Sequence, residues 1–143
     1  MNEDYWTSED KFIFKPEFNE PIDKYVEIIK NYSQLIFSNY DDVESCIETN
    51  NLYSIKYRKN YKESKFNKPL GNSLNNLTSL THLTFGWGFN QPLNNSLNNL
   101  KCLTHLTLGC CFNQSIEIPF YIKNLTLSCN NVNLIDNLHN NIE

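Results

Sequence analysis

The chain has 143 residues, 40% of them apolar, and a formal net charge of −4 at pH 7. This length fits one domain. The negative charge and the scattered Lys residues argue against nucleic acid as a partner, because binding phosphates requires clustered Lys and Arg. No apolar stretch approaches 18 residues and no signal-peptide pattern is found, so we expect neither a membrane span nor secretion.

The numbers of Asn, Lys and Cys residues indicate the kind of source genome and the compartment in which the protein resides. The chain has 24 Asn, no Ala, and 11 Lys against a single Arg, Arg58. Asn and Lys have AT-rich codons, so this bias predicts an AT-rich source genome. The five Cys form an odd number without a secretion signal, which favours a reducing compartment and an intracellular location.

A 23-residue unit occurs twice in the chain, at 66–88 and 89–111, and the two copies are identical at 16 positions. This unit is the template for the N-terminal part, residues 1–65. Residues 11–22 match the junction of two such units, which predicts a strand that ends at Phe14. The other expected strands end at Phe37, Tyr57, Phe85, Leu108 and Leu127. Their spacing is uneven, because insertions in repeat proteins go to the return loops.

Helical segments are expected between the first strands. Apolar residues recur at helical spacing from Ile22 onward, which predicts a helix over 22–32. A shorter helix is expected at 43–47. The charged stretch 58–65 is expected to be an exposed loop, and the tail 131–143 a cap on the last repeat.

The strand of each later repeat has one buried face. Leu83 and Phe85 alternate with His82 and Thr84, which is the period of a strand that is half buried. The same alternation in the next two copies predicts an open face made of His82, Thr84, His105, Thr107, Asn124 and Thr126. These six residues are the predicted partner-binding surface.

The return half of each repeat has Leu residues three positions apart. This spacing suits a 3₁₀ or single helical turn with one buried edge, and Ser73 and Ser96 are its expected caps. The sequence therefore predicts a repeat solenoid with a curved parallel sheet of about six short strands and short helical or irregular returns. Residues 1–65 are its diverged repeats and 66–130 its well-matched ones.

Two motifs resemble known repeat families. LNNLTSLTHLTF, residues 74–85, resembles the leucine-rich repeat. The corner FNQPL, residues 89–93, resembles the FNIP repeat, a leucine-rich-repeat variant of social amoebae and giant DNA viruses, and the third copy carries the Ile118-Pro119 pair of that family. The resemblance implies a curved solenoid that binds a partner on its concave sheet and performs no catalysis. FNIP proteins often carry an F-box, which is not recognisable here.

The Phe-Asn corner has a physical interpretation of its own. Asn offers two donors and an acceptor, so stacked Asn side chains can satisfy backbone groups from coil to coil. We therefore expect Asn67, Asn90 and Asn113 to be buried and to form a ladder. Beside it, Phe66, Phe89 and Phe112 are expected to stack as an aromatic spine.

Two groups of residues raise the question of chemistry. His82 and His105 stack on the open face, as a metal-ligand pair or a general base would. No acidic residue occupies an equivalent place to orient either ring, so duplication of the repeat is the favoured explanation. Cys110 and Cys129 hold equivalent positions in adjacent coils. A disulfide or a metal site is possible there, but reduced thiols are favoured because no Cys-x-x-Cys pair exists.

The predicted function is a non-enzymatic protein-interaction module without catalytic residues, cofactor or metal. The alternatives are a structural or self-assembling subunit of a larger particle, and the substrate-recognition part of a ubiquitin-ligase adaptor. The expected location is the cytoplasm of an amoebal or virus-infected host cell. Trp87 is expected to pack at the rim of the sheet, with an exposed anchor for a partner as the alternative.

Overall fold

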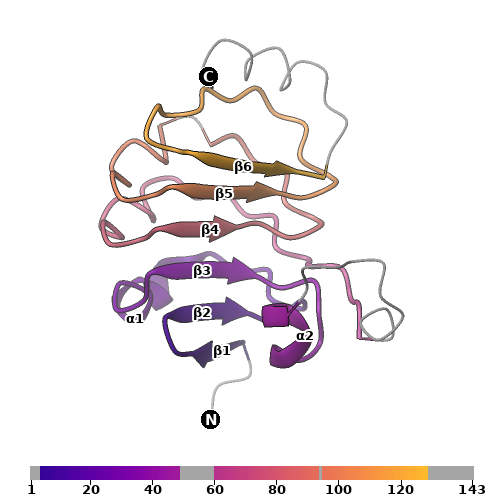
Figure 1. Ribbon diagram of the computed structural model, residues 1–143. Coiled ribbons are helices and arrows are strands. Elements are labelled where there is room, and N and C mark those ends of the chain that lie inside the picture. The colour runs from indigo at the N-terminus through magenta and orange to yellow at the C-terminus, as the bar shows by residue number, and fades with distance from the viewer. Residues whose placement is uncertain (1–3, 49–59, 94, 129–143) are drawn as a thin grey trace.

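The computed structural model describes residues 4–48, 60–93 and 95–128. Six strands form one sheet in chain order, and the return segments of the repeats lie along one face of this sheet (Figure 1). The strands are β1 (Tyr5–Ser8), β2 (Lys11–Phe14), β3 (Gln34–Phe37), β4 (His82–Thr84), β5 (His105–Leu108) and β6 (Asn124–Leu127). The strands expected to end at Phe14, Phe37, Leu108 and Leu127 end there, and β4 ends one residue before Phe85.

The sheet is parallel from β2 to β6, but β1 is an antiparallel strand that the sequence analysis missed. β1 and β2 form a hairpin in which Glu9 has a φ of 54°, at a turn position where Gly is usual. The absence of that Gly is why the turn was not recognised. The ring of Tyr5 stacks on Phe12 at 4.3 Å, so β1 covers the first parallel strand.

An insertion follows β3. The strand expected to end at Tyr57 lies outside the described residues, and β3 pairs directly with β4. Equivalent corner positions lie 48 residues apart across this junction instead of 23. The chain rejoins the coil at Ser64, where Asn39 Oδ1 accepts hydrogen bonds from the amides of Ser64 at 2.9 Å and Trp87 at 2.8 Å.

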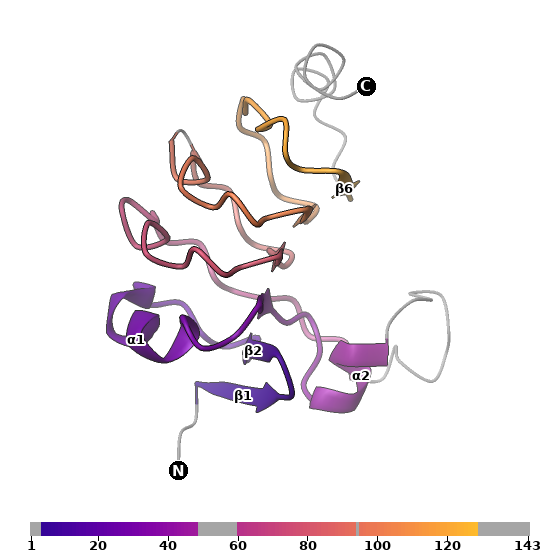
Figure 2. The same cartoon turned by 60° about the vertical axis from the view of Figure 1, so that its left-hand side comes forward.

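The two helical segments differ in how well they were predicted. The first begins at the predicted residue, as the 3₁₀ turn η1 (Ile22–Tyr25) followed by α1 (Val26–Ile29), and is shorter than the predicted 22–32. The second, α2 (Val43–Glu48), is confirmed, and Asp42 accepts a hydrogen bond from the Ser45 amide at 2.9 Å. The two helices lie on opposite sides of the sheet (Figure 2).

The returns of the repeats are single turns with buried Leu edges, as predicted. The amide of Leu77 donates to Leu74 O at 3.0 Å, and that of Leu80 donates to Leu77 O at 3.1 Å. The predicted Ser caps are wrong. The hydroxyl of Ser73 donates to Asp23, and that of Ser96 donates to Gly71 O at 3.3 Å, so both serines link one coil to its neighbour.

Phe side chains stack through the core in two columns. The corner column has ring centroids 5.9, 5.8 and 6.1 Å apart, from Phe18 through Phe66 and Phe89 to Phe112. The strand-end column has spacings of 5.2 and 5.5 Å, from Phe14 through Phe37 to Phe85. Figure 2 shows the return segments fanned more widely than the strands. The predicted cap at 131–143 lies outside the described residues.

Candidate functional site

The outward side chains of β4, β5 and β6 form two columns in strict register. His82 lies opposite His105, which lies opposite Asn124, and Thr84, Thr107 and Thr126 pair in the same way. These six residues are called the open sheet face below. Leu83 and Leu106 point to the other side and are buried. The columns continue onto β3 as Gln34 and Ile36, which the sequence analysis did not include because β3 has diverged from the repeat.

The open sheet face ends near β2. Ile13 pairs with Ile36 and alternates with Phe12 and Phe14 of the core, so it points outward, yet it is fully buried. Helix α2 lies on this side of the sheet (Figure 2). The accessible part of the outward surface therefore begins at β3, where Gln34 and Ile36 are half-buried, and continues over β4–β6.

The two imidazole rings of the face are stacked. The centroids of His82 and His105 are 4.1 Å apart, with 12° between the ring planes. Each Nδ1 lies 2.8 Å from the hydroxyl of the preceding Thr. The Thr81 hydroxyl donates to Ser33 O at 3.1 Å, and the Thr104 hydroxyl donates to Thr81 O at 3.3 Å.

These contacts fit rings that carry their proton on Nδ1. A hydroxyl has one proton, and here it goes to a backbone carbonyl, so the Thr oxygen accepts the proton of Nδ1. Each Nε2 then carries a lone pair. The amide nitrogen of Asn124 lies 3.0 Å from Nε2 of His105, where it donates to that lone pair. Burial, followed by the neighbouring His105, lowers the pKa of His82, so its imidazole is neutral at pH 7.

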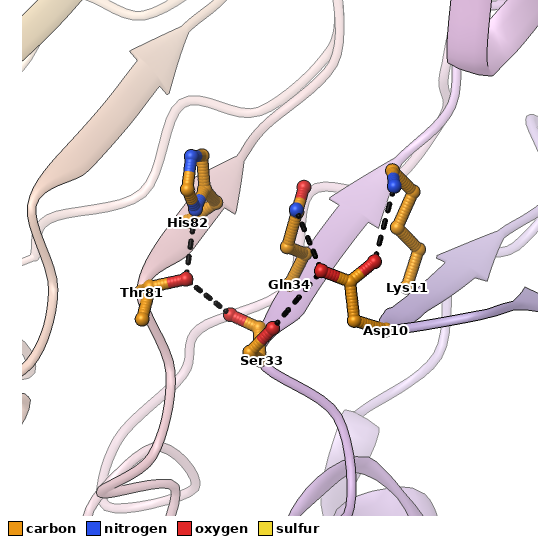
Figure 3. A network of polar contacts seen from close by, with 6 residues as sticks. All are labelled: Asp10, Lys11, Ser33, Gln34, Thr81 and His82. Carbon is orange, nitrogen blue, oxygen red and sulfur yellow. Dashed lines mark hydrogen bonds and ion pairs between the residues drawn. The ribbon is translucent and has the colours of Figure 1, made fainter.

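A polar network extends from the His82 column to the N-terminal hairpin (Figure 3). Asp10 accepts hydrogen bonds from the Ser33 hydroxyl at 3.4 Å and the Gln34 amide at 3.2 Å. It also pairs with Lys11 at 3.1 Å, and this hydrogen bond is the main reason that the pKa of Asp10 is lowered. Asp10 is thus held by β2 and β3, and in the described residues it does not contact a histidine ring.

The corner residues form a ladder of side-chain to backbone bonds. The amide of Asn90 donates to Asn67 Oδ1, and that of Asn113 donates to Asn90 Oδ1, both at 2.8 Å. Asn19 extends the ladder by accepting from the Asn67 amide at 2.9 Å. The expectation of burial is wrong for all three, because the corner lies at the molecular surface: Asn67 and Asn113 are exposed and Asn90 is half-buried.

Gln side chains reinforce this ladder and were missed in the sequence. The amide of Gln91 donates to Asn67 O and Oδ1 at 3.2 and 3.1 Å, and that of Gln114 donates to Asn90 O and Oδ1 at 3.3 and 3.1 Å. The signal was the FNQ triplet of the second and third copies, where the first copy has Lys68.

The thiols are separate from the open sheet face. Cys102, Cys110 and Cys111 are free and exposed, and Cys129 lies outside the described residues. Burial raises the pKa of the Cys46 thiol, which makes it a weak nucleophile. The described residues contain no group of three or more His, Cys, Asp or Glu placed to hold a metal ion. Trp87 is half-buried at the rim.

The stacked coils, each a short strand followed by a Leu-lined return, define a leucine-rich-repeat-like fold. The chain is similar to CroV588, a protein of the giant virus CroV described as a novel circular leucine-rich-repeat protein, with 30% sequence identity and a TM-score of 0.50. The match covers 90% of this chain and 19% of CroV588, so the chain spans about a fifth of that protein. No family model and no curated protein matches the chain, and FNIP membership stays a prediction. In the described segments, no helix is long and apolar enough to cross a membrane.

Proposed function

We propose that the chain is a non-enzymatic module that binds a protein partner on the concave face of its sheet, at the open sheet face. The observation that carries this proposal is the register of the two outward columns. Parallel strands repeat their side chains at ~4.8 Å. Because neighbouring strands hold each backbone, the partner meets a pre-ordered polar array, which lowers the entropic cost of binding.

The other surfaces are poorer binding sites. The core side is filled by Leu and Phe, and the returns are rich in Asn and vary in length along the chain, so they offer no fixed array. On the resemblance to FNIP repeats and the likeness to CroV588, we place this binding in the cytoplasm of an amoebal or virus-infected host cell. A role in a ubiquitin-ligase adaptor rests on the resemblance alone.

Site-specific crosslinking tests the proposal. A photo-crosslinking residue at Thr107 should capture a partner from host lysate, whereas the same group at Asn99, on the return side, should not. His82→Ala combined with His105→Ala should abolish this capture while leaving the melting temperature nearly unchanged. Capture that persists in the double variant but is lost on Trp87→Ala would move the site to the rim.

A self-assembling subunit is the second candidate, and the β6 end of the sheet favours it. Leu125 and Leu127 are partly exposed, whereas Leu106 and Leu108, the equivalent residues of β5, are 1% and 0% exposed. A partly exposed apolar end is a typical contact between repeat units. Sedimentation velocity distinguishes the two candidates. A monomer at all concentrations favours the binding module, whereas association that Leu127→Lys abolishes favours assembly.

A further inference from the structure

One column of outward side chains crosses the sheet from β3 to β6 and is called the acceptor column below. It consists of Gln34, His82, His105 and Asn124, one residue from each strand. Asn124 is exposed and the other three residues are half-buried, so the column is accessible along its length. The groups that hold these side chains from behind decide which atoms the column presents to a partner.

The histidines of the column direct their donors toward the starts of the strands. The hydroxyls of Thr81 and Thr104 each donate to a backbone carbonyl and lie 2.8 Å from Nδ1 of the following ring. Because a hydroxyl has a single proton, the proton of that contact is on Nδ1, and Nε2 keeps its lone pair. Figure 3 shows the second ring nitrogen of His82 on the side away from Thr81, where it is an acceptor.

The two amide side chains of the column are oriented in the same sense. The NH₂ group of Gln34 donates to the Asp10 carboxylate at 3.2 Å. Since a carboxylate only accepts, the oxygen of Gln34 faces the other way (Figure 3). The NH₂ group of Asn124 lies 3.0 Å from Nε2 of His105 and donates to its lone pair, so the Asn124 oxygen is the acceptor. The column thus uses its donors within the protein and presents acceptors.

We propose that the acceptor column recognises a cationic side chain, Arg or Lys, of the protein partner. This inference rests on the proposed function of the open sheet face and adds the chemistry of its partner. Arg and Lys carry donors only, whereas the carboxylates of Asp and Glu would bring further lone pairs against those of the column. The N–H groups of Arg form a rigid fork, which suits acceptors repeated on neighbouring strands at ~4.8 Å.

The charges near the column place the cation at Gln34 and His82. The chain has a formal net charge of −4, which favours the approach of a cation. Lys11, opposite Gln34 on β2, is compensated by Asp10, with which it pairs at 3.1 Å. At the other end, Lys123 directly precedes β6 and is exposed, so it repels a cation there. The acceptors of β3 and β4 are therefore the favoured site.

The direction of the hydrogen bonds is tested without any partner. Long-range proton–nitrogen NMR spectra of the full chain at pH 7 should show His82 and His105 with the proton on Nδ1. In Thr81→Val, His82 should gain a form that is protonated on Nε2, whereas Asn99→Ala, on the return side, should leave the spectrum unchanged. A proton on Nε2 of His82 in the unsubstituted chain would overturn the proposal and leave the proposed function intact.

Peptide selection tests the chemistry of the partner. A displayed library of random peptides is selected on the full chain, with counter-selection on the double variant His82→Ala and His105→Ala. Peptides that bind only the unsubstituted chain should be enriched in Arg and Lys. Exchanging that residue of the peptide for Glu should weaken binding about 10–100-fold, as the loss of a hydrogen bond to a charged group does.

Substitutions in the chain give the matching comparison. His82→Lys should remove binding of the Arg peptide and favour its Glu counterpart, whereas Asn99→Ala should change neither. Selected peptides that depend on the histidines but are rich in Asp or Glu would overturn the proposal and keep the proposed function. A selection that gives no peptide dependent on the histidines would overturn both.

Discussion

The repeated half, from β4 to β6, and the diverged N-terminal half are built with the same internal connections. Phe18 stacks on Phe66 at 5.9 Å, and Phe66 stacks on Phe89 at 5.8 Å. Asn19 accepts from the Asn67 amide just as Asn67 accepts from that of Asn90. The comparison teaches that the Phe-Asn corner sets the stacking of the coils, while the other positions are free to vary.

The two halves differ on the outward surface. Where the repeated half has Thr84, Thr107 and Thr126, the N-terminal half has Ile13 and Ile36. Ile13 is fully buried, whereas the Thr column is half-buried to exposed. The outward surface is thus closed at β2 and open from β3 onward, where Ile36 is half-buried like Thr84 and Thr107.

The largest expected effect is at the junction of the halves. Phe37 stacks on Phe14, Phe66 and Phe85 at 5.2, 4.2 and 5.5 Å, and it is 1% exposed. Phe37→Ala should lower the free energy of unfolding by about 3–5 kcal/mol, measured by urea denaturation. Phe120→Ala, at a side chain that is 83% exposed, is the control and should change it by less than about 0.5 kcal/mol.

Hydrogen exchange on the same variant tests whether the halves are one unit. Protection should fall in β2 and in β5 together, because one core runs through both. Loss of protection confined to the N-terminal half would show that the repeats fold without it.

The next largest loss of stability is expected where two coils of the repeated half approach each other closely. A Cβ added at Gly109 would lie 2.3 Å from Gly86 O, so the backbone must move. Gly109→Ala should cost about 1–3 kcal/mol, the usual range for overpacking. Ser128→Ala is the control, because Ser128 is the equivalent, exposed position of the last described coil. If both changes have the same small effect in thermal unfolding, the coils are not packed this closely.

A smaller effect on the free energy of unfolding is expected at the Asn ladder of the corner, where the two halves differ. Asn90 accepts from both Asn113 and Gln114, whereas Asn19 accepts from the Asn67 amide, beside which Lys68 replaces Gln. Asn90→Ala should cost about 1 kcal/mol, and Asn19→Ala should cost less. The return-side change Asn99→Ala should have little effect. A larger loss for Asn19 than for Asn90 in chemical denaturation would contradict the role of the Gln bonds.

The sequence predicted the repeats well because the strand period and the Phe-Asn corner are local signals. It predicted five of the strand ends to within one residue. The expected strand that ends at Tyr57 lies outside the described residues, in the segment between β3 and β4, which pair directly. The hydrogen bonds of Thr81 and Thr104 to the histidines depend on the pairing of distant strands, which the spacing of residues does not reveal.

The smallest effect is expected where the insertion rejoins the N-terminal half. Glu17 pairs with Lys62 at 2.7 Å and Lys65 at 3.0 Å, and all three side chains are about half exposed. Hydrogen bonds from these two lysines lower the pKa of Glu17 below its ordinary value of 4.5. Because the pKa of Glu17 is lower in the folded protein than in the unfolded chain, its ionised carboxylate stabilises the fold at pH values above 4.5. This stabilisation is lost as the pH falls through the lowered pKa. Glu17→Gln should therefore lower the melting temperature slightly at pH 7, and the difference should vanish in 1 M salt, where the Debye length is about 3 Å. A difference that persists in acid and in high salt would mean that Glu17 acts through packing rather than through its charge.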